Sequence, residues 1–168
     1  VLAGPKARDV LSGLTDASLE NADFPWRTAQ QIEIAGIPTL ALRINYVGEL
    51  GWELHPAMAD LPALYAAVWA AGESHGIADF GLYAMNSLRM EKGYRGWGAE
   101  LTNEVTMLEA DMARFFASAK EDFVGKAATE NYEAGSLRLV YFEVEAQDAD
   151  VRGGEPIFVG DTCVGVTT

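Results

Sequence analysis

Residues 39–55 carry the pattern that most constrains the fold: a strand, a glycine turn and a returning strand. Along 39–47, side chains alternate with the period of two that is typical of a strand. The members of one face are Leu40, Leu42, Ile44 and Tyr46. Gly48 and Gly51 allow the backbone conformations of a tight turn, and 52–55 follows as the partner strand. The pattern predicts two paired strands of a sheet.

Helical spacing of apolar residues recurs elsewhere in the chain. The longest such segment is 57–75, and Gly76 follows it, as is typical of a helix C-terminus. Asp79 is suited to cap the next helix, which we expect to end near Gly93. The other expected helical segments are 6–14, 107–119 and 123–133.

Strand composition also occurs before the hairpin, at 30–37, and again late in the chain. The late segments are 137–145, 157–159 and 163–166. Because strands are followed by helices and then by strands, the order favours an α+β fold, with packed helices on an antiparallel or mixed sheet. We expect one domain over 1–135 and the start of a second, mostly β domain at 136–168.

Charge and composition exclude several classes of function. The net charge of −13 argues against a nucleic-acid partner and against docking on an anionic membrane. The chain has two histidines and one cysteine, so we expect no His/Cys metal site. It begins with Val1 and has no basic leader, and its last residues read as a hairpin that has only begun. We therefore expect a piece of a longer protein.

Two glutamates stand in the segment 45–56, Asn-Tyr-Val-Gly-Glu-Leu-Gly-Trp-Glu-Leu-His-Pro, and allow two interpretations. An ionised carboxylate accepts best from two adjacent donors, such as a guanidinium or the 2-amino and N3–H edge of a pterin or guanine. Glu53 could provide such a carboxylate, with Tyr46 packing on a flat ring. Alternatively, Glu49 and Glu53 lie in solvent on an ordinary hairpin, with Tyr46 and Trp52 in the core.

Three further residues are candidates for ligand binding or proton transfer because of their positions in the predicted elements. Arg89 falls on an apolar helical face, so it needs a carboxylate or an anionic ligand; a structural salt bridge would satisfy it equally. His55 shares a strand face with Glu53, and the pair could transfer protons. Trp97 stands in a glycine-rich loop that lacks the lysine and serine of a phosphate-binding loop.

Three motifs, at 46–54, 88–101 and 122–126, occur in an order that resembles the folate-binding aminomethyltransferase family. This family includes the T protein of the glycine cleavage system and the C-terminal part of dimethylglycine and sarcosine dehydrogenases. Gly-Glu-Leu-Gly-Trp-Glu-Leu and Glu-Lys-Gly-Tyr-Arg-Gly-Trp-Gly are closer to the dehydrogenase branch. The residues from about 153 resemble the start of the family's small C-terminal β-barrel-like domain, at 136–168.

The resemblance implies tetrahydrofolate as the ligand. The residues that it implies for folate binding are Tyr46, Glu53, Arg89 and Trp97, with Glu53 on the pterin edge. The family's key aspartate belongs to an N-terminal segment that nothing here matches, so we expect no catalytic residue in this chain, and no metal. Met85 stands where the T protein has a ligand-contacting arginine, which again favours the dehydrogenase branch.

The implied function is transfer of a one-carbon unit from a methylated amine of the dimethylglycine or sarcosine type to tetrahydrofolate. FAD would be bound only by a separate upstream domain, and the missing N-terminal segment would be a partner of this piece. The alternatives are a glycine cleavage aminomethyltransferase, a non-enzymatic binding module of the same fold, and a purely structural domain. The expected location is the bacterial cytoplasm or the mitochondrial matrix.

Overall fold

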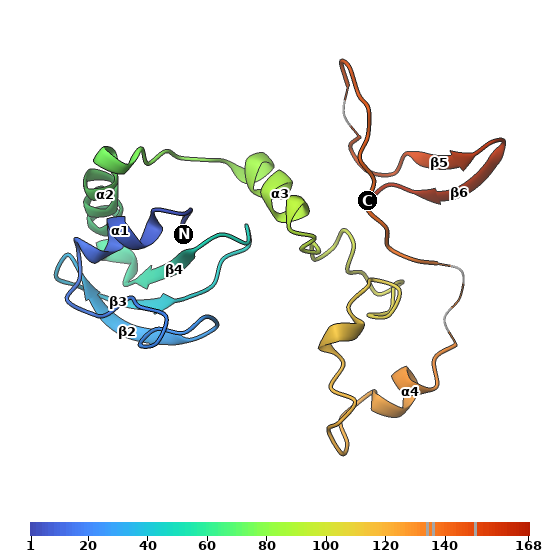
Figure 1. Cartoon of the computed structure of the whole chain (residues 1–168), viewed down its shortest axis with the longest axis horizontal. Helices are drawn as coiled ribbons and strands as arrows, with labels where there is room; N and C mark the ends of the chain where they lie inside the picture. The colour runs from blue at the N-terminus through green and yellow to red at the C-terminus, as the bar shows by residue number, and fades with distance from the viewer. Residues whose placement is uncertain (134, 136, 150) are drawn as a thin grey trace. The chain divides into compact units, whose positions relative to one another are not determined.

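The computed structural model describes residues 1–133, 135, 137–149 and 151–168 (Figure 1). These residues form two compact units, Val1–Tyr94 and Arg95–Thr168. Each unit combines strands with helices, which confirms the predicted α+β class. The predicted division into 1–135 and 136–168 stays a prediction.

The first unit contains a four-stranded antiparallel sheet with the strand order β1-β4-β3-β2. Its strands are β1 (Leu2–Ala3), β2 (Ala29–Ile34), β3 (Ile37–Leu42) and β4 (Gly51–Pro56). Ala35 and Gly36 join β2 to β3, and both have positive φ, 52° and 74°. A two-residue turn with both residues in this conformation matches the twist of a hairpin. The predicted pairing of the strands before and after Gly48 is confirmed.

The strand before the turn is shorter than the sequence pattern predicts, because β3 ends at Leu42 and not at Val47. Asn45 is the physical reason. Its side-chain oxygen accepts from the N–H of Val47 at 3.0 Å, and its amide nitrogen donates to the carbonyl of Glu49 at 2.7 Å. Local bonds of this kind compete with strand pairing, so residues 43–50 form an ordered loop.

Three helices belong to the first unit, and each falls within a predicted segment: α1 (Ala7–Ser12), α2 (Leu61–Gly72) and α3 (Leu82–Glu91). Short 3₁₀ turns, η1 (Met58–Asp60) and η2 (Glu73–His75), extend α2, and Gly76 ends it in the left-handed conformation. The N-cap of α3 is Gly81 and not the predicted Asp79. Asp79 instead accepts a hydrogen bond from the hydroxyl of Tyr65 at 2.8 Å.

The core lies between α1, α2 and one face of the sheet, where both helices contact β4 (Figure 1). Trp52 on β4 is completely buried and meets Phe24 edge to face, with 6.2 Å between the ring centroids. The other buried sheet residues are Leu2, Ile32, Ile34, Thr39, Ala41 and Gly51. Burial of this apolar surface is the main stabilising term of the unit.

The face that carries Leu40 and Leu42 is therefore the uncovered one. Leu40 lies opposite His55, and Leu42 opposite Glu53, so these four side chains share the side of the sheet away from Ala41 and Trp52. Leu40 is 40% exposed. The buried face of β3 is thus the one that carries fewer large apolar residues.

The described residues of the second unit lie mainly in turns and loops. Its regular elements are η3 (Ala113–Phe115), α4 (Lys126–Glu130) and a hairpin of β5 (Pro156–Val159) and β6 (Thr162–Val166). The hairpin and a helix within 123–133 match the sequence predictions. The predicted helix at 107–119 was wrong, since only η3 forms there. The predicted strand at 137–145 was also wrong: the described residues show no strand there, and the N–H of Leu139 donates to the carbonyl of Glu109. A strand needs a paired neighbour for its backbone groups.

Candidate functional site

Glu53 lies on the uncovered face of β4, and its side chain is 31% exposed. One carboxylate oxygen lies 3.4 Å from Nε2 of His55, which is its one polar contact within the described part of the chain. Leu42 is its direct neighbour across the strand pair. The arrangement leaves a carboxylate with free acceptor positions beside an apolar side chain.

Tyr46 lies in the loop between β3 and β4, and not on a strand face as predicted. Its ring is partly buried and stacks on the ring of Tyr94, with 6.3 Å between centroids and an interplanar angle of 28°. The bonds of Asn45 to the backbone of Val47 and Glu49 order the same loop. The ring stack with Tyr94 and the ordered backbone of the loop therefore hold Tyr46 in place.

The two glutamates of the motif differ in their contacts. Glu49 forms an ion pair with Lys92, with 3.2 Å between the carboxylate oxygen and Nζ. Both side chains are about 40% exposed, so such a pair contributes little to stability, about 0–1 kcal/mol. Glu49 is thus paired within the protein, whereas the one polar contact of Glu53 among the described residues is with His55.

Arg89 is the buried residue of α3, with 4% exposure. Its Nε donates to the side-chain oxygen of Asn86 at 2.8 Å, and Nη1 donates to the carbonyl of Tyr94 at 2.9 Å. Neither bond reaches Glu53. Arg89 therefore holds the chain that leaves α3, and the structure does not bring it to the Glu53 carboxylate.

Trp97 belongs to the second unit and is 89% exposed. The loop around it is held by Glu100, whose carboxylate accepts from the N–H of Gly96 at 2.5 Å. Gly98 has a φ of 83°, which favours glycine. A role of Trp97 in ligand binding stays a prediction, as do those of Tyr46, Glu53 and Arg89.

The third motif, 122–126, contains a lysine that bonds to the backbone of the preceding turn. Nζ of Lys126 donates to the carbonyls of Ser118, Lys120 and Glu121 at 3.1, 2.6 and 3.3 Å. Gly125, with a φ of 88°, precedes α4. Lys126 therefore closes the preceding turn, and these bonds account for the motif without a ligand.

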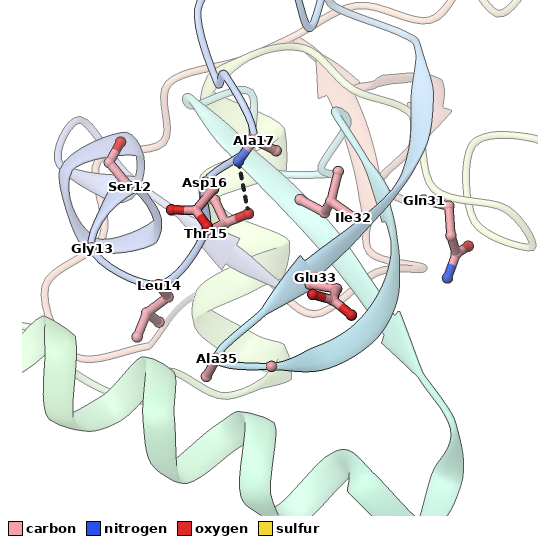
Figure 2. Close-up of a pocket in the computed structure, with 11 residues that line it drawn as sticks. Ser12, Gly13, Leu14, Thr15, Asp16, Ala17, Gln31, Ile32, Glu33 and Ala35 are labelled. Atoms are coloured by element: carbon pink, nitrogen blue, oxygen red, sulfur yellow. Dashed lines mark hydrogen bonds between the residues drawn. The ribbon is translucent and has the colours of Figure 1, made fainter.

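An open depression of about 700 Å³ lies between residues 12–17 and 31–36 of the first unit (Figure 2). Figure 2 shows Thr15 on one side, where its hydroxyl accepts from the N–H of Ala17 at 3.2 Å, and Glu33 on the other. None of the predicted site residues lines it.

Among the described residues, no three or more His, Cys, Asp or Glu side chains lie close enough together to hold a metal ion. In the same residues, no helix is both long and apolar enough to cross a membrane.

Sequence reasoning missed two residues beside the candidate ligand groups, Leu42 and Tyr94. The register of the hairpin would have placed Leu42 opposite Glu53 if the length of the loop had been known. Tyr94 follows Glu91-Lys92-Gly93 in a recognised motif, but nothing in its spacing indicates that its ring meets Tyr46.

Comparison with known proteins gives one domain match and several relatives. Residues 1–120 match the GCVT N-terminal domain. The mitochondrial dimethylglycine dehydrogenase of Homo sapiens is 42% identical over 170 residues, covering 99% of this chain and 20% of the relative. The mitochondrial sarcosine dehydrogenase of Mus musculus is 40% identical over 168 residues, covering 98% of this chain and 18% of the relative.

Bacterial relatives carry a different name. The aminomethyltransferase of Corynebacterium aurimucosum is 36% identical over 168 residues, covering 98% of this chain and 45% of the relative. The chain thus spans about a fifth of the length of the dehydrogenases and under half of the aminomethyltransferase. The resemblance drawn from the three motifs is confirmed: with residues 1–120 matched, the chain belongs to the GCVT N-terminal domain family.

Proposed function

We propose that this chain is part of a tetrahydrofolate-binding domain that accepts a one-carbon unit from a methylated amine of the dimethylglycine or sarcosine type. The product would be 5,10-methylenetetrahydrofolate. The observation that carries the proposal is the Glu53 carboxylate, which lies on an uncovered sheet face with one described polar contact.

The chemistry of the Glu53 surroundings fits a pterin ring. A carboxylate offers two coplanar acceptor oxygens, which match the 2-amino and N3–H donors of the pterin edge. Leu42 lies directly across from Glu53, and Leu40, two pairs further along, is the next β3 residue on the same face. These apolar side chains provide a surface on which a flat ring would lose contact with water while its donors reach Glu53.

Tyr46 adds an aromatic ring in the loop that precedes β4, and its stack on Tyr94 limits its rotation. Tetrahydrofolate supplies the nitrogen atoms that take up the one-carbon unit. The residues of this chain bind and orient it, and we propose no acid or base among them. The amine would be oxidised by FAD bound in a separate upstream region of the full-length protein.

Folinic acid binding to the full-length protein tests the proposal. We expect Glu53→Gln to weaken binding roughly 10-fold to 100-fold in isothermal titration calorimetry, since a hydrogen bond to a charged group is worth about 1.5–3 kcal/mol. The matched control is Glu33→Gln, on the exposed side of β2, which should bind as the wild type does. Equal binding by the Glu53→Gln variant and the wild type would contradict the role of Glu53.

The reaction itself is assayed in the full-length protein with dimethylglycine, sarcosine and an aminomethylated carrier as donors. Two relatives have dehydrogenase names and higher identity than the aminomethyltransferase, 42% and 40% against 36%, which favours the methylated amines. Turnover with the aminomethylated carrier alone would instead indicate a glycine cleavage aminomethyltransferase. Folinic acid binding without turnover of any donor would indicate a non-enzymatic binding module.

The cellular location of the protein depends on which of these alternatives holds. The dehydrogenase relatives are named as mitochondrial proteins. We propose the mitochondrial matrix or the bacterial cytoplasm, depending on the source of the protein, and cell fractionation tests this.

A further inference from the structure

The loop of residues 45–50 and the segment that follows α3, Lys92–Tyr94, meet at three separate points within the first unit. The sequence motifs that contain them are about 40 residues apart in the chain. The structure brings them together through a ring stack, an ion pair and the close approach of the Gly48 backbone to the Lys92 side chain. These contacts do not involve Glu53, so they can be changed separately from it.

The ring stack joins Tyr46 to Tyr94, and Tyr94 is itself fixed at the end of α3. The N–H of Tyr94 donates to the carbonyl of Arg89 at 2.9 Å. Nη1 of Arg89 donates back to the carbonyl of Tyr94 at 2.9 Å. Because Arg89 is buried and also bonded to Asn86, the Tyr94 ring has a rigid support.

Lys92 holds the turn of the same loop. Its Nζ lies 3.2 Å from the Glu49 carboxylate, and its aliphatic stem lies against Gly48. A Cβ added at Gly48 would be 2.5 Å from Cγ of Lys92, and the φ of 70° at Gly48 is one that side chains rarely adopt. Glycine at position 48 therefore allows the turn to lie directly on Lys92.

We infer that Lys92–Tyr94 is the positioning element of the proposed folate site: Tyr94 fixes the ring of Tyr46, and Lys92 fixes the turn at Gly48 and Glu49. The inference rests on the proposed function. A ring held before the ligand arrives loses less freedom on binding, so its contact contributes more to affinity. Lys92 and Tyr94 act through other residues and are positioning residues, with no direct contact to the folate required.

Folinic acid affinity of the full-length protein tests this, measured by calorimetry. We expect Tyr94→Leu to raise the Kd roughly threefold to tenfold, because a stacked aromatic pair is worth up to about a factor of ten. Tyr94→Phe keeps the ring and should bind as the wild type does. In a Tyr46→Leu background, Tyr94→Leu should have no further effect, because the residue through which it acts is already gone.

The ion pair gives a second, independent measurement. We expect Lys92→Glu to raise the Kd about twofold to fourfold by repelling Glu49, and the exchanged pair of Lys92→Glu with Glu49→Lys to restore the wild-type Kd. Melting temperatures without ligand, taken for all variants, separate an effect on binding from an effect on folding.

Three outcomes would overturn the inference. If Tyr94→Leu binds folinic acid normally while Glu53→Gln does not, the proposed function stands and the positioning role fails. If Tyr94→Leu weakens binding equally with and without Tyr46, the effect does not pass through Tyr46. If the wild type does not bind folinic acid, the proposed function and this inference both fail.

Discussion

The two faces of β4 differ in what they contact, although their residues alternate in the chain. Trp52 points to α1 and α2 and is fully buried, while Glu53, the next residue, is 31% exposed on the uncovered side. One short strand thus has a buried face and an uncovered face. Substitutions on the inner face should change the free energy of unfolding, and those on the outer face should change ligand affinity with little effect on stability.

The largest expected effect is that of Trp52→Ala on the inner face. Removing a fully buried Trp leaves a cavity and costs about 3–5 kcal/mol of unfolding free energy, measured by urea denaturation. Trp52→Phe should cost clearly less, because the indole Nε1 has no hydrogen-bond partner among the described residues and no bond is lost. A loss below about 1 kcal/mol for Trp52→Ala would contradict this placement of the core.

Arg43 tests the polar part of the inner face and should have the next largest effect. Its guanidinium donates to the carbonyl of Phe24 at 2.5 Å and to the side-chain oxygen of Asn21 at 2.6 Å, and it lies 5.6 Å from the Trp52 ring. Arg43→Leu leaves the Phe24 carbonyl without this donor, so we expect a loss of about 1.5–3 kcal/mol in urea denaturation.

An exposed arginine provides the control for Arg43. Arg114 lies over Phe115 in the second unit at 4.9 Å, and it is exposed. Arg114→Leu should change stability by no more than about 0.5 kcal/mol. If both substitutions had equal effects, the hydrogen bonds of Arg43 would not be what stabilises the inner face.

Leu40 tests the apolar part of the outer face and should have a smaller effect. Because its side chain is 40% exposed, Leu40→Thr should lower the unfolding free energy by less than about 1 kcal/mol. The matched inner-face variant is Ile34→Thr, at a residue with no exposure, and we expect it to cost two to three times as much by the same measurement. Equal losses would mean that something covers the outer face in solution.

The smallest expected effect on stability is that of Glu53→Gln. The carboxylate is partly exposed and its ion pair with His55 spans 3.4 Å, so we expect a change within about 0.5 kcal/mol in urea denaturation. The same variant should lose folinic acid affinity, which makes it the sharpest separation of the two faces. A large loss of stability would assign Glu53 a structural role.

Sequence reasoning identified the elements that have strong local signals and failed where distant partners decide. The hairpin, the helix before Gly76 and the helix with Arg89 were predicted from spacing alone. The end of β3 was misplaced by five residues, since the side-chain bonds of Asn45 end the strand while its apolar alternation continues to Val47. The predicted strand at 137–145 has suitable composition, but the described residues offer it no paired strand.

The candidate site was predicted in part. The resemblance indicated Glu53 and Tyr46, and the structure places both in the first unit, with Glu53 uncovered and Tyr46 stacked on Tyr94. It also distinguishes the two glutamates, because Glu49 forms an ion pair with Lys92 and Glu53 does not. For Arg89, the described bonds reach the Asn86 amide and the Tyr94 carbonyl, and its role in folate binding stays a prediction.

The sequence by itself determined that Trp52 and Glu53 face opposite ways, because successive side chains of a strand always do. It also determined the turn at Gly48 and the family, through three ordered motifs. Only the tertiary structure decided which face is buried, because both sides of β3 carry apolar residues and the choice belongs to helices far along the chain. The contacts of Tyr46 with Tyr94 and of Glu49 with Lys92 likewise depend on where α3 ends in space, which no local pattern encodes.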